Sequence, residues 1–301
     1  MIAIADSVTV LRDGQTIVTL DAHKGEVSEA TLIKHMVGRE IENIYPQRPN
    51  KQLGEVVLEV RNWDAYNPAL GRSILRDVSM NVRRGEIVGL AGLMGSGRTE
   101  LALSIFGNPL GYRVTGELLL KGQKRSFRQP EDAIKAGVAY VTEDRKGNGL
   151  ILIQDVKENI TLANLQAIAQ RSVIDSNAEI KVANEYKASL NIKTPSVEQR
   201  VGNLSGGNQQ KVCLSKWLFV KPDLLILDEP TRGIDVGAKF EIYTIMNRLV
   251  EQGMSIIMIS SELPEVLGMS DRVYVVSSGR ITGELPIAEA TQEKIMQLAT
   301  N

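Results

Sequence analysis

The sequence has one cysteine, almost no net charge and no long apolar run. Cys213 is the only cysteine among 301 residues, which excludes an intrachain disulfide and favours a reducing cytosol as the compartment. No apolar stretch approaches the roughly 18 residues of a membrane span, and the start of the chain lacks the basic residues and apolar length of a signal peptide. The net charge of −1 gives no reason to expect nucleic acid or an anionic membrane surface as the main partner.

The chain contains an internal repeat. Residues 8–18 have the pattern of a β-hairpin with a glycine turn, and residues 29–37 have that of a short helix. The same sequence pattern returns near the other end of the chain. The matching residues are Asp6-Ser7-Val8-Thr9-Val10 with Asp271-Arg272-Val273-Tyr274-Val275, Gly14 with Gly279, Ala30-Thr31 with Ala290-Thr291, and Met36 with Met296.

The repeat predicts how the chain is divided into domains. Its 43% hydrophobic and 24% charged residues are typical of a globular protein, and its length suits one large α/β domain or two ordinary ones. We expect residues 1–40 to be the tail of a first copy whose body is missing, 41–53 to be a polar linker, and 54–301 to be a complete second copy. We also expect residues 1–50 to pack poorly, because their hairpin has lost its sheet. The alternative is that two hairpin–helix units are alike by chance.

A glycine-rich segment joins a predicted strand at residues 87–91 to a predicted helix at 100–106. The segment reads Gly92-Leu93-Met94-Gly95-Ser96-Gly97-Arg98-Thr99. Its glycines allow backbone N–H groups to turn towards a phosphate, and the helix start adds positive potential. Thr99 offers a hydroxyl to Mg²⁺. Arg98 stands where such loops carry lysine, and a wide guanidinium fork is no neutral substitute. We interpret the segment as an impaired nucleotide-binding loop; a strand–helix turn without a ligand is the alternative.

Two further motifs follow in the second half of the chain. Residues 204–211 read Leu-Ser-Gly-Gly-Asn-Gln-Gln-Lys, a turn that opens a helix and so presents a hydroxyl and backbone N–H groups to an anion. Residues 224–230 read Leu-Leu-Ile-Leu-Asp-Glu-Pro, a buried strand that ends in two acids. Together with the glycine-rich loop, these motifs resemble the signature sequence and the Walker B strand of ATP-binding cassette (ABC) ATPases.

The resemblance implies an α/β fold of the P-loop NTPase, ABC-ATPase type. Such a fold has a RecA-like core, an antiparallel β subdomain and a helical subdomain that carries the signature. The polar helical stretch at 177–190 fits the helical subdomain, although a solvated helical insert is equally consistent. ABC domains bind ATP between two copies arranged head to tail, so that the P-loop of one copy faces the signature of the other.

The resemblance also assigns roles to residues of this chain. Glu229 would be the general base for the attacking water, and Thr99 with Asp228 would hold Mg²⁺. Residues 92–99 would bind the phosphates of ATP. Further contacts to ATP are expected from the following residues: Glu143, where the family has glutamine; Tyr66, preferred to Trp63 as the residue that stacks on adenine; the signature residues Ser205, Gly206 and Gly207; and Asp235, in the loop that links the two sites.

The chain departs from the family at two positions. Arg98 replaces the P-loop lysine, and the histidine that contacts the γ-phosphate is missing, since His23 and His35 are the only histidines in the sequence. Loss of one preorganised donor typically costs about 10²–10³ in rate. We therefore hypothesise that this domain binds ATP as a slow structural site and that its Ser205 signature completes the hydrolysing site of the first copy.

A narrower resemblance comes from the long Walker B extension, residues 227–239, and from Ser260-Ser261-Glu262-Leu263-Pro264-Glu265. Both resemble the second half of bacterial monosaccharide-importer ATPases of the ribose, galactose, arabinose and xylose types. This implies ATP hydrolysis coupled to sugar uptake, a membrane permease and a periplasmic or lipid-anchored sugar-binding protein as partners, and a peripheral position on the inner face of the cell membrane. A soluble ABC ATPase outside transport and a non-hydrolysing regulatory subunit are the alternatives.

Overall fold

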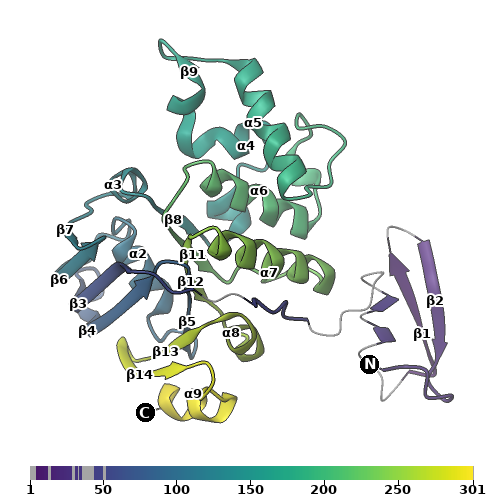
Figure 1. The fold of residues 1–301 in the computed structure, drawn as a ribbon, viewed down its shortest axis with the longest axis horizontal. Helices are drawn as coiled ribbons and strands as arrows, with labels where there is room; N and C mark the ends of the chain where they lie inside the picture. The colour runs from purple at the N-terminus through teal and green to yellow at the C-terminus, as the bar shows by residue number, and fades with distance from the viewer. Residues whose placement is uncertain are drawn as a thin grey trace.

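The computed structural model describes residues 5–12, 15–28, 31–32, 34–35, 44–49 and 52–300. Figure 1 shows a body with a central sheet, a second sheet to one side, a helical layer above it and a separate N-terminal hairpin. Within the described ranges, no helix is both long and apolar enough to cross a bilayer.

Six strands form the central sheet in the spatial order β14, β13, β5, β12, β11, β8. Five of them run parallel, and β14 is antiparallel to β13. Most residues of the inner strands are buried, which explains why their sequences are continuous apolar runs rather than alternating ones. The strands are β5 Ile87–Gly92, β8 Val138–Val141, β11 Leu224–Asp228, β12 Ser255–Ile259, β13 Arg272–Ser277 and β14 Arg280–Pro286.

The central sheet separates two hydrophobic cores. Alternate residues of β5 point to opposite faces, so Val88 and Leu90 join one core while Ile87 and Ala91 join the other. One core is shared with the antiparallel sheet β4 Arg72–Arg83, β3 Val56–Asn67, β6 Arg113–Leu120 and β7 Gln123–Arg125, and with helices α2 Arg98–Ile105 and α3 Pro130–Lys135. The other is shared with α6 Gly206–Leu218, α7 Val236–Glu251, α8 Leu263–Met269 and α9 Gln292–Ala299.

A helical subdomain lies between β8 and β11 in the sequence and forms the upper part of the view in Figure 1. Asp155 begins its first helix with a capping box, and Asp175 caps the long helix α5. The helical prediction for 177–190 is confirmed. The elements are η1 Arg145–Gly149, α4 Val156–Thr161, η2 Leu162–Ile168, β9 Ala169–Gln170, β10 Val173–Ile174, α5 Ser176–Ser189 and η3 Val201–Asn203.

The N-terminal hairpin, β1 Ser7–Arg12 with β2 Gln15–Asp21, has the register of the hairpin β13–β14. Every residue pair of the first hairpin recurs in the second at an offset of 265 residues, including the register shift after Val10 and after Val275. The predicted hairpin is thus confirmed, and its likeness to β13–β14 extends from sequence to backbone pairing. Of the predicted helix 29–37, residues 31–32 and 34–35 are described and are helical.

Part of the predicted linker packs against the body, which contradicts the expectation of poor packing for residues 44–49. The Tyr45 ring lies against Tyr243 of α7, with centroids 5.4 Å apart. The Pro46 carbonyl accepts a hydrogen bond of 2.6 Å from the Asn247 side chain, and buried Arg48 forms an ion pair with Asp271. The sequence signalled only turn-forming prolines here, whereas an aromatic ring and a buried arginine provide the packing. Residues 1–4, 13–14, 29–30, 33, 36–43 and 50–51 of the predicted tail and linker lie outside the described residues.

Candidate functional site

The glycine-rich loop connects β5 to α2 at the carboxyl edge of the central sheet, as the sequence predicts. Gly92, Gly95 and Gly97 have φ angles of 154°, 75° and 107°, which residues with a side chain rarely adopt. A Cβ on Gly92 would also lie 2.3 Å from the Val276 carbonyl oxygen. The Ser96 hydroxyl is buried without a hydrogen-bond partner. Leu93 and Met94, which the sequence also assigns to ATP, are exposed at the tip of the loop.

Arg98 is buried beneath the loop instead of reaching out of it. Arg98 is the first residue of α2. Its Nη1 donates a 2.6 Å hydrogen bond to the carbonyl of Ser260, the residue that follows β12. Arg98 is 8% exposed. Burial lowers the pKa of Arg98, while the nearby carboxylates of Glu229 and Asp228 act in the opposite direction. The guanidinium is therefore held by protein in this structure, at the base of the predicted phosphate site.

Asp228 ends β11 with its carboxylate fully buried. Its Oδ2 accepts a 2.7 Å hydrogen bond from the Tyr140 hydroxyl of β8, whereas its Oδ1 is buried without a hydrogen-bond partner. Burial raises the pKa of Asp228, and the hydroxyls of Tyr140 and Thr99 oppose that shift. An orphaned carboxylate oxygen beside a threonine hydroxyl is the donor chemistry that Mg²⁺ prefers, so both predicted metal residues fit the ion.

Glu229 follows Asp228 and has a φ of 48°, an uncommon conformation for a residue with a side chain. Its N–H donates to the Ile259 carbonyl at 2.9 Å, which fixes it between β11 and β12. The Ser261 hydroxyl lies 3.1 Å from Glu229 Oε2. Burial raises the pKa of Glu229, although Ser261 and Arg98 lower it. A raised pKa makes this carboxylate a stronger base towards a water molecule.

Glu143 and the two candidate adenine residues, Trp63 and Tyr66, have different surroundings. Glu143 follows β8 and forms an ion pair with Arg232 of the Walker B extension. Trp63 is 7% exposed and donates from its indole to Ser104 in the core, so it has no free face for a base. Tyr66 is 37% exposed near the end of β3. The preference for Tyr66 over Trp63 therefore agrees with their exposure.

The signature residues lie at the start of α6, against the beginning of α7. A Cβ on Gly207 would meet the Ala238 Cβ at 2.5 Å, and one on Gly206 would lie 3.1 Å from the Gly233 carbonyl oxygen. Ser205 is exposed and accepts a 2.9 Å hydrogen bond from the Asn208 side chain. Asp235 caps α7 through the Ala238 N–H. Among the described residues, no hydrogen bond joins Ser205–Gly207 to the glycine-rich loop.

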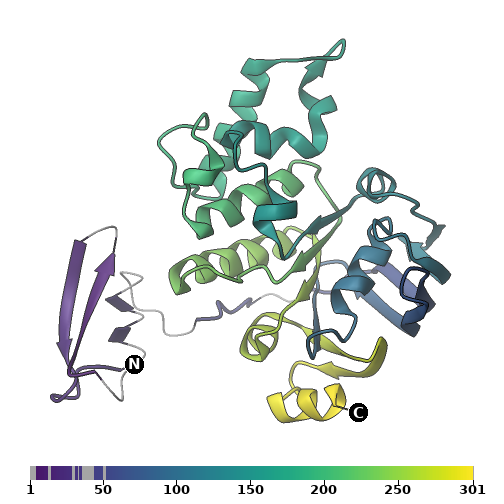
Figure 2. The same cartoon turned by 180° about the vertical axis from the view of Figure 1, so that it is seen from behind.

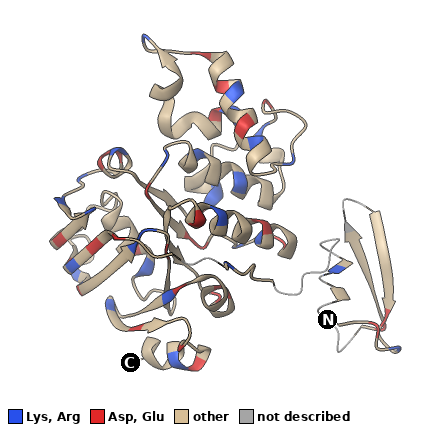
Figure 3. Ribbon diagram, in the orientation of Figure 1, with Lys and Arg blue, Asp and Glu red and all other residues tan. Residues whose placement is uncertain are grey.

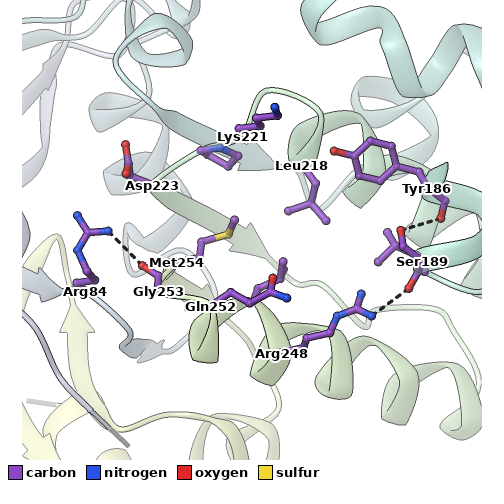
Figure 4. A pocket seen from close by; sticks show the side chains of 13 residues that line it. Arg84, Tyr186, Ser189, Leu218, Lys221, Asp223, Arg248, Gln252, Gly253 and Met254 are labelled. Carbon is purple, nitrogen blue, oxygen red and sulfur yellow. Dashed lines mark hydrogen bonds between the residues drawn. The ribbon is translucent and has the colours of Figure 1, made fainter. Parts of the chain in front are cut away.

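A pocket of about 510 Å³ lies elsewhere, at the opposite edge of the sheet. Figure 4 shows Asp223, which precedes β11, and Met254, which precedes β12, among its lining residues together with Arg84 and Arg248. Parallel strands present their amino ends on that edge. Since ligands of open α/β sheets bind beyond the carboxyl ends, this pocket is not the predicted site.

The structure adds residues that the sequence analysis did not assign to the site. Tyr140 holds Asp228, and Ser261 holds Glu229. Glu265 of α8 accepts hydrogen bonds from Thr231 and Ser260. Of these residues, the sequence indicated only Ser261, which lies soon after β12, where the family has its phosphate-contacting histidine.

The β topology and the loop at the end of β5 define the class of protein, an ABC ATPase cassette of mixed α/β architecture. It has a TM-score of 0.69 with a crystal structure of a nucleotide-free ATP-binding cassette from an ABC transporter, at 20% identity, covering 82% of this chain and 96% of that chain. The profile of the ABC transporter family matches residues 75–232, and the chain belongs to that family.

Curated relatives are considerably closer in sequence. The chain is 57% identical over 298 residues to the L-arabinose transport ATP-binding protein AraG of Geobacillus stearothermophilus. It is also 57% identical over 298 residues to the xylose import ATP-binding protein XylG of Thermoanaerobacter pseudethanolicus. Each match covers 99% of this chain and 58% of the relative, so the chain spans little more than half the length of these relatives.

Proposed function

We propose that the chain binds MgATP at the β5–α2 loop as part of the ATP-binding subunit of a bacterial monosaccharide importer. The observation that carries the proposal is that three groups lie at the carboxyl ends of β5 and β11, on either side of β12: the glycine-rich loop, the orphaned Asp228 oxygen and Glu229. The names of the arabinose and xylose relatives suggest the substrate class. Which sugar is carried depends on other subunits.

In this proposal, the loop's backbone N–H groups and Ser96 bind the phosphates, and Thr99 and Asp228 hold Mg²⁺. The metal, when bound, neutralises phosphate charge and orients the terminal phosphate. Glu229 orients a water and accepts its proton. Tyr140 keeps the Asp228 carboxylate ionised and oriented by donating to it.

The same site has features of a slow hydrolase. Arg98 is buried and donates through Nη1 to the Ser260 carbonyl, so the protein already uses one of its N–H donors. Ser261, with a short hydroxyl, stands in the region where the family has its phosphate-contacting histidine. We infer that this cassette retains ATP longer than it hydrolyses it, and that its exposed Ser205 completes the site of another cassette.

The repeated hairpin supports that inference. The hairpin β1–β2 repeats the register of β13–β14 residue for residue, and in the body that hairpin is joined to β5. Leu11 of β1 is 66% exposed, while its counterpart Val276 is fully buried. We infer that residues 1–40 belong to a first cassette, whose sheet would cover Leu11, and that residues 54–301 form the second cassette.

The permease is expected to dock beside the β8 end of the sheet. Glu143, Asp144, Arg145, Lys146 and Arg232 line a pocket of about 320 Å³ there. Ile153, a few residues later, is 80% exposed, and apolar exposure next to charged residues is typical of protein contacts. Figure 3 shows basic and acidic residues interspersed over the described part of the ribbon, and this mixture does not favour nucleic acid as the partner. Docking here would hold the subunit on the inner face of the membrane.

Equilibrium binding of MgATP to the purified chain tests the first step. We expect Asp228→Asn to weaken binding in the presence of Mg²⁺ and to have little effect in EDTA. Asp223→Asn is the matched control, because Asp223 precedes the same strand at the opposite edge and pairs with Lys121. Equal effects of the two variants would contradict the assignment of Asp228. Transport by a reconstituted arabinose- or xylose-type permease tests the second step.

A further inference from the structure

Two segments of the ATP site, one after β11 and one after β12, are joined beneath the site by a buried carboxylate. Glu265 of α8 is 1% exposed. Its Oε1 accepts a 2.8 Å hydrogen bond from the Thr231 hydroxyl, and its Oε2 accepts one from the Ser260 hydroxyl. Thr231 and Ser260 are each 1% exposed. A buried carboxylate without a cation partner is costly, so hydroxyl donors from separate segments have to remain in place around it.

Both hydroxyl donors are next to groups already placed in the site. Thr231 lies two residues after Glu229 in the chain. Ser260 precedes Ser261, whose hydroxyl contacts Glu229. The Ser260 carbonyl also accepts the hydrogen bond from Arg98. A shift of either segment would therefore move a group that faces the ATP site.

Tyr243 of α7, which is 1% exposed, also interacts with the Glu265 carboxylate through its hydroxyl. The Tyr45 ring packs on Tyr243. It also fills the space over α8 that the absent side chain of Gly268 leaves, since a Cβ there would lie 2.2 Å from Tyr45 Cγ. Figure 2 shows the segment that contains Tyr45 running past the body from the N-terminal hairpin.

We propose that Glu265 is a positioning residue of the ATP site and that, through Tyr243, it couples the site to residues 44–49. This inference rests on the proposed function. The carboxylate fixes Ser260 and Thr231, and so the places of Arg98 and Glu229, while Tyr45 closes the carboxylate off from solvent. Because coupling is reciprocal, MgATP binding should in turn steady residues 44–49.

Equilibrium binding of MgATP to the 301-residue chain tests the positioning role. We expect Glu265→Ala to weaken MgATP about 10–100-fold, the range found for groups that orient ligating side chains. Glu265→Gln should restore most of the affinity, because its amide can both accept and donate to the hydroxyls. Glu179→Ala is the matched control: it too removes a buried glutamate bound by a threonine hydroxyl, Thr161, but in the helical subdomain. It should leave affinity unchanged.

Ser260→Ala carries the test if Glu265→Ala does not fold, since it removes only the hydroxyl and keeps the carbonyl that binds Arg98. It should weaken MgATP at least threefold. If wild type binds and both Glu265→Ala and Ser260→Ala bind like Glu179→Ala, the positioning role is wrong and the proposed function stands. If wild type binds no MgATP, the proposed function fails and this inference with it.

Amide hydrogen exchange at residues 44–49 tests the coupling. MgATP should slow exchange there in wild type and in Glu179→Ala, and should slow it less in Ser260→Ala. Exchange that MgATP leaves unchanged in wild type, under conditions where MgATP is bound, would overturn the coupling.

Discussion

Tyr140→Phe removes the hydroxyl that donates to Asp228, the carboxylate that we propose holds Mg²⁺. The Tyr140 hydroxyl and Asp228 are both buried. Their hydrogen bond to Asp228 Oδ2 is 2.7 Å long, and Asp228 Oδ1 has no hydrogen-bond partner. A hydrogen bond to a charged group contributes about 1.5–3 kcal/mol. For a domain of this size, that loss lowers the melting temperature by roughly 3–12 °C.

The pH dependence distinguishes this mechanism from a simple packing defect. Burial already raises the pKa of Asp228, so the folded chain binds this proton more tightly than the unfolded chain. Stability contributed by the group is therefore lost as pH rises through its folded-state pKa. Without Tyr140 the pKa rises further, so the melting-temperature difference between wild type and Tyr140→Phe should be larger at pH 8 than at pH 5.

Thermal melts of the purified chain without nucleotide provide the assay. Tyr186→Phe is the control, because its ring packs on Phe219 outside the site. In an Asp228→Asn background, the cost of Tyr140→Phe should fall to about 0.5–1.5 kcal/mol, the range for a neutral hydrogen bond. If Tyr140→Phe lowers the melting temperature equally at both pH values and in both backgrounds, the hydrogen bond from Tyr140 does not shift the pKa of Asp228.

Three other variants test the remaining groups of the site. Burial raises the pKa of Glu229, so Glu229→Gln should have a higher melting temperature than wild type at pH 8 and a similar one at acid pH. Its residual ATP hydrolysis should be lost. A lower melting temperature than wild type at pH 8 would contradict the raised pKa. Gly207→Ala places a Cβ 2.5 Å from that of Ala238, so the signature segment has to shift. MgATP binding by this chain should persist, while hydrolysis in a partner cassette should fall roughly 10²-fold. Unaltered phosphate release by the partner would count against the signature role. Arg98→Lys frees a cation from the Ser260 carbonyl and should raise this chain's own phosphate release, by at most about 10²–10³ for one donor; no increase would show that Arg98 is not limiting.

Local sequence was sufficient to predict the glycine-rich loop and the acidic strand end. Both depend on short-range chemistry: positive φ at Gly92, Gly95 and Gly97, and two acids directly after a buried strand. Parallel strands place such ends at one edge of a sheet, so their proximity followed from fold class. The helices predicted at 100–106 and 177–190 are present as α2 and α5 with ends that differ by one or two residues, whereas α3, α7 and α8 were not predicted.

The supporting contacts were not predictable, because they depend on strand order and on gaps in packing. Tyr140 reaches Asp228 across 88 positions only because β8 and β11 are neighbours. Glu265 was only the last residue of the motif at 260–265, and no local pattern indicated that its carboxylate accepts from Thr231 and Ser260. Tyr45 docks where Gly268 leaves space on α8, a match between segments more than 200 residues apart that no local pattern records.

We propose above that this cassette binds ATP with little hydrolysis and completes the site of another cassette. The most direct test is steady-state ATP hydrolysis by the purified chain, alone and mixed with the first cassette of a related sugar importer. We predict that the chain alone binds MgATP with little turnover and that hydrolysis appears in the mixture. Brisk turnover by the chain alone would contradict it, because Arg98 and the absence of a phosphate-contacting histidine would then be no obstacle to hydrolysis.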